Sequence, residues 1–128
     1  MRGREIRTGF VGAGYIAPWH AEALASVPGT RLVAVCDTQP EAAAVLAATH
    51  GAASYAGLER MLAVERLEAV HVLTPPHLHR DHALAALQAG AHVLLEKPLP
   101  LSRAQADEIV RAAENARPVV GGEHKLPP

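Results

Sequence analysis

A glycine-rich turn between an apolar strand and a helix restricts the folds open to this sequence. Residues 12–17 read GAGYIA and follow the apolar run Ile6–Val11. In a GxGxxA turn the first glycine permits the sharp bend, the second lets a phosphate approach the backbone, and the small last residue allows helix and strand to pack closely. We expect this segment to bind phosphate through Gly12, Gly14, Tyr15 and Ile16, although a turn without a ligand also explains the pattern.

Apolar runs of strand length alternate with longer segments of helical pattern along the whole chain. This alternation predicts βαβ units, and therefore an α/β fold with a doubly wound parallel sheet covered by helices on both faces. The run AVHVL is nearly all apolar, as expected of a strand buried on both sides. The six expected strands are residues 6–11, 32–36, 53–55, 69–73, 92–95 and 119–121.

The size and composition fit one domain with a core of small side chains. The chain has 128 residues, of which 49% are hydrophobic but only 3% aromatic. A domain of this size has room for one core, and we expect slim helices packed closely on the sheet. Two of the helices have recognisable starts, because Thr38 with Glu41 and Ser102 with Gln105 each have the spacing of a capping box.

An acidic residue lies where a dinucleotide-binding fold needs one. Asp37 directly follows the second expected strand, 23 positions after Gly14. A carboxylate there accepts hydrogen bonds from the hydroxyls of the adenosine ribose and repels a 2′-phosphate. Since Thr38 and Gln39 supply no cation to offset it, we expect Asp37 and Thr38 to bind NAD in preference to NADP. The glycine turn and Asp37 alone leave an S-adenosylmethionine-dependent methyltransferase open.

Three later motifs resolve this choice by resemblance. Residues 74–79 read TPPHLH, residues 89–93 read AGAHV, and residues 96–98 read EKP. Together with the glycine turn, His20 and Asp37, and in this order and spacing, they resemble the N-terminal domain of the Gfo/Idh/MocA oxidoreductase family over the whole chain.

The resemblance implies both a fold and a reaction. The family's fold is a Rossmann domain with strand order 3-2-1-4-5-6, which binds an extended NAD across the carboxyl ends of its strands. Its reaction is hydride transfer between the nicotinamide and a secondary alcohol of a sugar, cyclitol or polyol. The family's second domain supplies the substrate pocket and the dimer surface. We expect residues 1–128 to be the dinucleotide-binding domain without that second domain, and therefore to bind cofactor without turnover. A stand-alone NAD-binding module, acting as a sensor or partner subunit, is the alternative.

The resemblance also implies residue roles. Lys97 is the expected catalytic residue, which hydrogen-bonds the reacting hydroxyl or carbonyl beside the nicotinamide, and Glu96 orients its loop or contacts the cofactor. Thr74 and Pro75 run along the nicotinamide end, and His79 shapes the loop around it. The composition supports a special role for Lys97 independently: of 12 basic residues only Lys97 and Lys125 are lysines.

Three histidines in one segment raise the question of a metal. His79 and His82 lie one helical turn apart and His77 is offset, but no cysteine or suitably spaced carboxylate completes a zinc set. We therefore expect no metal site.

Charge and cysteine content limit the remaining partners. The net charge is −1, which gives no reason to expect binding to nucleic acid or to a membrane surface. The single cysteine, Cys36, cannot form an internal disulfide, which favours the reducing cytoplasm. Apolar residues near the missing domain's position, at Leu99, Leu101 and Leu126, predict self-association into a homo-oligomer.

Overall fold

The computed structural model describes residues 5–95, 103–116 and 120–122. Strands and helices alternate, and every pair of neighbouring strands is parallel. Within these described ranges the sheet has six strands in the order β3-β2-β1-β4-β5-β6, which confirms the Rossmann topology expected above. The strands are β1 (Ile6–Val11), β2 (Thr30–Cys36), β3 (Ala53–Tyr55), β4 (Ala69–Val72), β5 (His92–Leu95) and β6 (Val120–Gly122).

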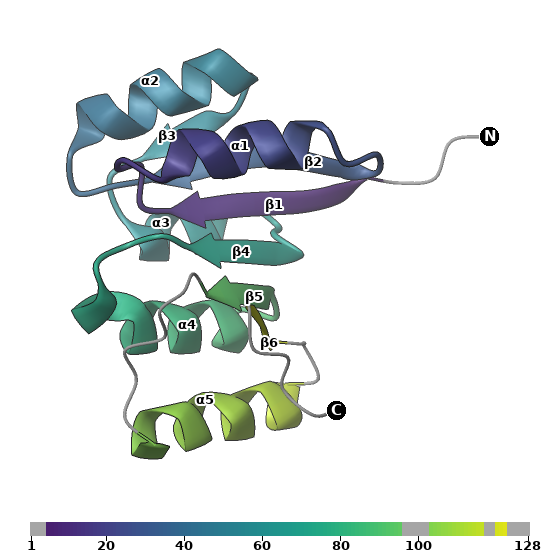
Figure 1. The fold of residues 1–128 in the computed structure, drawn as a ribbon, viewed down its shortest axis with the longest axis vertical. Helices are drawn as coiled ribbons and strands as arrows, with labels where there is room; N and C mark the ends of the chain where they lie inside the picture. Colours follow the sequence, from purple (N-terminus) through teal and green to yellow (C-terminus); the bar gives the residue numbers. More distant parts are fainter. Residues whose placement is uncertain (1–4, 96–102, 117–119, 123–128) are drawn as a thin grey trace.

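Helices cover both faces of this sheet (Figure 1). On one face, alanines of the first two helices pack over Phe10 and Val35. On the other face, side chains of the later helices pack over Val11, Val70 and Val72. The helices are α1 (Ala17–Ala25), α2 (Pro40–His50), α3 (Leu58–Val64), η1 (a 3₁₀ turn, Pro76–Leu78), α4 (His79–Gln88) and α5 (Arg103–Ala116).

The packing depends on small residues, as the scarcity of aromatic residues predicts. Ala17, Ala43, Ala83 and Ala86 are fully buried where their helices meet the sheet. At Gly9 of β1 an added Cβ would lie 2.5 Å from Cδ1 of Leu67, so a larger residue would have to push the Leu67 side chain aside. Small residues therefore let the helices approach the sheet closely.

The capping box predicted at Thr38 is wrong. Helix α2 begins at Pro40, its N-cap residue is Gln39, and no side chain caps it. The residue before a proline is disfavoured in the helical conformation, and Gln39 is accordingly extended, with φ −98° and ψ 98°. The helix therefore begins one residue later than a Thr38 cap requires. The second expected capping residue, Ser102, lies outside the described residues.

Smaller differences concern element ends. Strand β2 begins at Thr30, two residues before the expected start, and β6 begins one residue later than expected. Helix α4 begins at His79, directly after the 3₁₀ turn.

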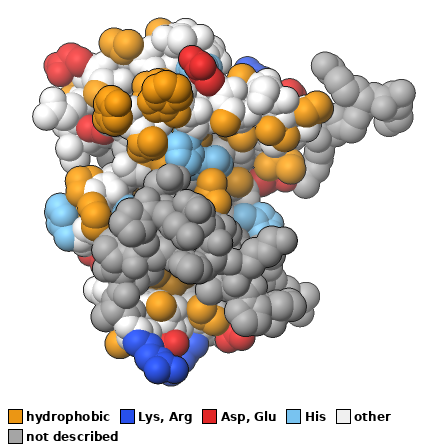
Figure 2. All heavy atoms as spheres, in the orientation of Figure 1, with side chains coloured by type: hydrophobic (Ala, Val, Ile, Leu, Met, Phe, Trp, Pro, Cys, Tyr) orange, Lys and Arg blue, Asp and Glu red, His pale blue; other side chains and the backbone are white. Residues whose placement is uncertain are grey.

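The outer surface is mixed. Figure 2 shows hydrophobic side chains exposed around α1 and α2 and basic ones gathered at the opposite end of the molecule, near α5. Arg80 of α4 pairs there with Glu108 of α5, with Nε and Oε1 2.6 Å apart. Among the described residues, no helix combines the length and the apolar character needed to cross a lipid bilayer.

Candidate functional site: a cleft at the carboxyl ends of the strands

Gly12 makes the turn out of β1 possible. Its φ is +106°, a conformation that residues with a side chain rarely adopt. An added Cβ would also lie 2.8 Å from the carbonyl carbon of Leu73 and 3.0 Å from the amide nitrogen of Thr74. The end of β4 thus presses against this turn, and both the conformation and the space require glycine.

Gly14 is glycine for a different reason. It lies outside the positive-φ region, and nothing lies within 4 Å of the position that its Cβ would take. The folded chain would therefore accept alanine here without strain. The open space beside Gly14 is where the sequence places the closely approaching phosphate, so the space available fits the expected ligand.

The start of α1 offers unpaired amides beside Gly14. The amide of Ala17 donates to the carbonyl of Gly14 at 3.1 Å. Within the part of the chain that the structure describes, the amides of Gly14, Tyr15 and Ile16 have no hydrogen-bond partner, and no side chain caps the helix. These donors lie at the positive end of the helix dipole and therefore suit an anion such as a pyrophosphate.

Asp37 joins the turn to the start of α2. One carboxylate oxygen accepts a hydrogen bond from the amide of Ala13 at 2.7 Å, and the other accepts one from the amide of Gln39, also at 2.7 Å. Each oxygen retains a further lone pair. The carboxylate is therefore fixed beside the glycine turn with acceptor capacity left for a ligand hydroxyl.

At the end of β4, two histidines hold Thr74. The carbonyl of Thr74 accepts a hydrogen bond from Nε2 of His79 at 2.7 Å, and its hydroxyl is 2.8 Å from Nδ1 of His82. His79 is only 4% exposed, and its Nδ1 is buried without a partner among the described residues. No group of three or more His, Cys, Asp or Glu side chains in the described part of the chain could hold a metal ion.

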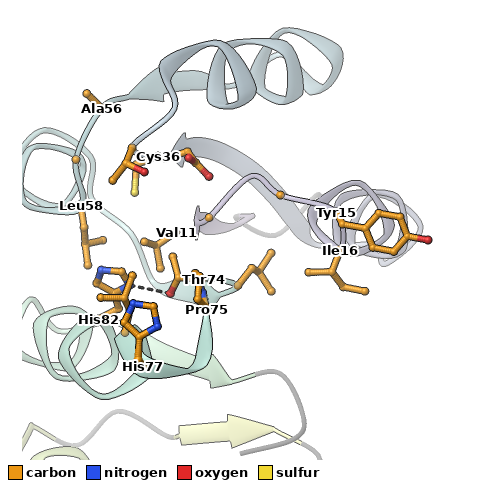
Figure 3. Close-up of a pocket in the computed structure, with 17 residues that line it drawn as sticks. Val11, Tyr15, Ile16, Cys36, Ala56, Leu58, Thr74, Pro75, His77 and His82 are labelled. Atoms are coloured by element: carbon orange, nitrogen blue, oxygen red, sulfur yellow. Dashed lines mark hydrogen bonds between the residues drawn. The ribbon is translucent and has the colours of Figure 1, made fainter. Parts of the chain in front are cut away.

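These elements surround one cleft of about 740 Å³ (Figure 3). Eight of the residues predicted from the sequence line it, namely Gly12, Gly14, Tyr15, Ile16, Asp37, Thr38, Thr74 and Pro75. His79 does not line the cleft and instead supports Thr74 from behind. Glu96 and Lys97 lie outside the described residues, as do Leu99, Leu101 and Leu126.

Sequence reasoning missed one wall of the cleft. This wall consists of Ala56, Gly57 and Leu58 after β3 together with His77, Leu78 and His82 from η1 and α4. The two segments come together because β3 pairs with β2, and because α3 and α4 pack beside each other on the same face of the sheet. No short motif marks residues 56–58, and only the apolar Leu58 hinted at a buried position.

Two titratable groups near the sheet are structural. Burial, with the Asp37 carboxylate adding to it, raises the pKa of the Cys36 thiol to about 12, so this thiol stays protonated. Burial and the neighbouring His20 lower the pKa of His71 to about 4. The Nδ1 atoms of His71 and His20 are 3.4 Å apart, and both rings pack against Phe10 on the face covered by α1. The Cys36 side chain itself is buried, with only 1% of its surface exposed.

Known proteins match this chain in sequence and in fold. The Gfo/Idh/MocA family model, described as an oxidoreductase family with an NAD-binding Rossmann fold, matches residues 6–124. A 1,5-anhydro-D-fructose reductase of Ensifer adhaerens is 38% identical over 122 residues, which are 94% of this chain and 36% of the relative.

Solved structures agree with this match. The WlbA dehydrogenase of Bordetella pertussis, in complex with NADH and UDP-GlcNAcA, superposes with a TM-score of 0.88 at 35% identity, over 95% of this chain and 36% of that one. KijD10, a 3-ketoreductase of Actinomadura kijaniata in complex with NADP and TDP-benzene, superposes with a TM-score of 0.87 at 30% identity. The match covers 94% of this chain and 37% of KijD10. The chain thus spans little more than a third of the proteins that it matches.

Proposed function

The chain belongs to the Gfo/Idh/MocA oxidoreductase family, and from this premise we propose that it is the NAD-binding part of an enzyme that oxidises or reduces a sugar-like molecule. The reaction moves a hydride between nicotinamide and a secondary alcohol of a sugar, cyclitol or polyol. The relatives are similar proteins named for such chemistry, including a reductase of 1,5-anhydro-D-fructose.

One observation carries the proposal. Three unpaired amides at the start of α1 and the fixed carboxylate of Asp37 line the same cleft. The amides suit the pyrophosphate of a dinucleotide, and the carboxylate suits the hydroxyls of the adjoining ribose. A bound dinucleotide would supply the hydride acceptor or donor. The protein would bind and orient it.

We propose that NAD is preferred over NADP. The carboxylate of Asp37 would repel a 2′-phosphate, and no lysine or arginine is among the described residues that line the cleft. The solved relatives include complexes with NADH and with NADP, so the family as a whole does not decide the preference. The side chains beside Asp37 favour NAD.

Lys97 is proposed to act on the substrate. It follows β5 by two positions, and the ends of β5 and β4 lie side by side, with Leu95 paired to Val72. An ammonium group at this position would hydrogen-bond the reacting oxygen and stabilise charge on it while the hydride moves. Glu96 is proposed to hold the same loop in place.

Turnover is proposed to need a substrate-binding unit in addition to residues 1–128. A cytosolic location is proposed because Cys36 is buried and has no disulfide partner.

Calorimetric titration with NADH, NADPH and S-adenosylmethionine tests the proposal. We expect NADH to bind most tightly and S-adenosylmethionine not to bind. Trp19, the only tryptophan, is 64% exposed and lies in the first turn of α1, where it gives a second, fluorescent readout. Tighter binding of NADPH would overturn the role of Asp37, and binding of S-adenosylmethionine alone would overturn the family function for this cleft.

A further inference from the structure

His82 lines the cleft, yet the proposed function gives it no task. It lies at the end of the first turn of α4, half-buried, with Nδ1 2.8 Å from the hydroxyl of Thr74. Among the residues that the structure describes, none bonds its Nε2. One ring nitrogen is thus fixed by the protein, and the other is available to a ligand.

The two ends of the cleft indicate where the pyrophosphate and the adenosine of a bound dinucleotide would lie. The pyrophosphate belongs at the start of α1, near Tyr15 and Ile16, and Asp37 marks the ribose. The base is attached to the ribose next to its 2′-hydroxyl, so it must lie beyond Asp37 on the side away from α1. Figure 3 shows Leu58 and His82 on that side, across Val11 and Thr74 from Tyr15 and Ile16.

This end of the cleft suits a flat heteroaromatic ring. Leu58 and Leu78 supply apolar surface, and His77 and His82 supply imidazole nitrogens that have no partner among the described residues. Of these two rings, the hydrogen bond to Thr74 fixes only that of His82. Adenine offers apolar faces and a polar edge that carries an amino donor as well as ring-nitrogen acceptors. The wall that sequence reasoning missed thus matches the base in both shape and polarity.

The hydrogen bond to Thr74 prepares His82 for this contact. A hydroxyl either donates or accepts, so Thr74 supports both neutral tautomers, and Nε2 is then either a donor or an acceptor. Burial lowers the pKa of His82, with His79 adding to this and Asp81 opposing it, so the ring is neutral near pH 7. His79 holds the Thr74 carbonyl, which fixes the partner of His82 in turn.

We propose that His82 determines specificity for adenine, with its Nε2 bonded to the polar edge of the base and its Nδ1 held by Thr74. This inference rests on the proposed dinucleotide function and adds to it the subsite for the base. It also places Thr74 between the base and the pyrophosphate, rather than at the nicotinamide end.

Two substitutions of His82 distinguish its proposed contact with the base from its hydrogen bond to Thr74. His82→Asn keeps a polar atom near the position of Nδ1 and removes Nε2, whereas His82→Leu removes both. We expect both variants to bind NADH and AMP about 5- to 10-fold more weakly than the wild type, which is the range for one lost hydrogen bond. The control His50→Asn, in the last turn of α2 and outside this cleft, should bind both ligands normally.

The outcomes distinguish the two proposals. If the wild type binds neither NADH nor AMP, the proposed function fails. If the wild type binds both and His82→Asn binds AMP equally well, the assignment of His82 fails alone, because His82 then serves only to hold Thr74 or acts on the other half of the dinucleotide. Nitrogen-15 NMR of the wild type gives an independent measurement that needs no variant: AMP should shift the His82 Nε2 resonance, and an unshifted resonance at saturation would overturn the proposal.

Discussion

The two ends of the cleft are built in different ways. At the α1 end, backbone groups define the site: the turn at Gly12, the open space at Gly14 and the amides that follow, with Asp37 fixed by two of the chain's own amides. At the α4 end, side chains define it, since His79 and His82 hold Thr74 from two sides. A backbone-built site tolerates few sequences, whereas a site built from side chains can be altered one contact at a time.

Gly12→Ala should produce the largest loss of stability. The added Cβ clashes with the backbone of Leu73 and forces a residue with a side chain into positive φ. Strain and overpacking together predict a loss of about 3–5 kcal/mol in the free energy of unfolding, measured by urea denaturation.

Gly51→Ala is the matched control for Gly12. Gly51 also has positive φ, +68° at the end of α2, but nothing lies within 4 Å of its Cβ position. Gly51→Ala should lower the free energy of unfolding by about 1 kcal/mol, because only the backbone conformation at this position is unfavourable for alanine. Equal losses at the two glycines would show that the contact between β4 and the turn does not matter.

His71 should make β4 sensitive to acid. Its pKa is about 4 in the folded chain against an ordinary 6.5 when unfolded, so the unfolded state takes up the proton first as the pH falls. Stability should therefore be complete above pH 6.5 and fall by up to about 3 kcal/mol as the pH drops toward 4. Urea denaturation across this range measures the change.

His71→Gln should remove most of this acid sensitivity, whereas His50→Gln should leave it unchanged. An equal slope in wild type and His71→Gln would mean that another group is responsible for the loss in acid.

His79→Leu should lower stability by about 2 kcal/mol, because the Thr74 carbonyl loses its donor in a buried place. His79→Gln carries an amide nitrogen near the position of Nε2 and should cost less than about 1 kcal/mol for that reason. Thermal or urea unfolding of the two variants tests whether the hydrogen bond, rather than the bulk of the ring, holds the end of β4.

Thr38→Ala should have the smallest effect. Because Gln39 and not Thr38 precedes the first turn of α2, its removal should change stability by less than about 0.5 kcal/mol. A loss near 1 kcal/mol in urea denaturation would instead restore Thr38 as a helix cap.

The same contrast explains how much the sequence could predict. The strands follow from apolar runs, and Gly12 and Asp37 follow from a turn and a spacing that are local in the chain. Leu58 and His82 could not be recognised as residues of the cleft wall. They come together only because β3 pairs with β2 and because α3 and α4 pack on one face of the sheet. Thr38 was misjudged because Pro40 determines where α2 begins, and this overrides the capping pattern.

Gly14→Ala tests most directly whether the backbone-built end of the cleft exists to approach a phosphate. Nothing in the folded chain contacts the new methyl group, so the free energy of unfolding should stay within about 0.5 kcal/mol of the wild type. The affinity for NADH, measured by calorimetry on the same samples, should fall at least about 10-fold, because the methyl group occupies the space that the pyrophosphate needs. Unchanged affinity for NADH in a variant of unchanged stability would contradict the account.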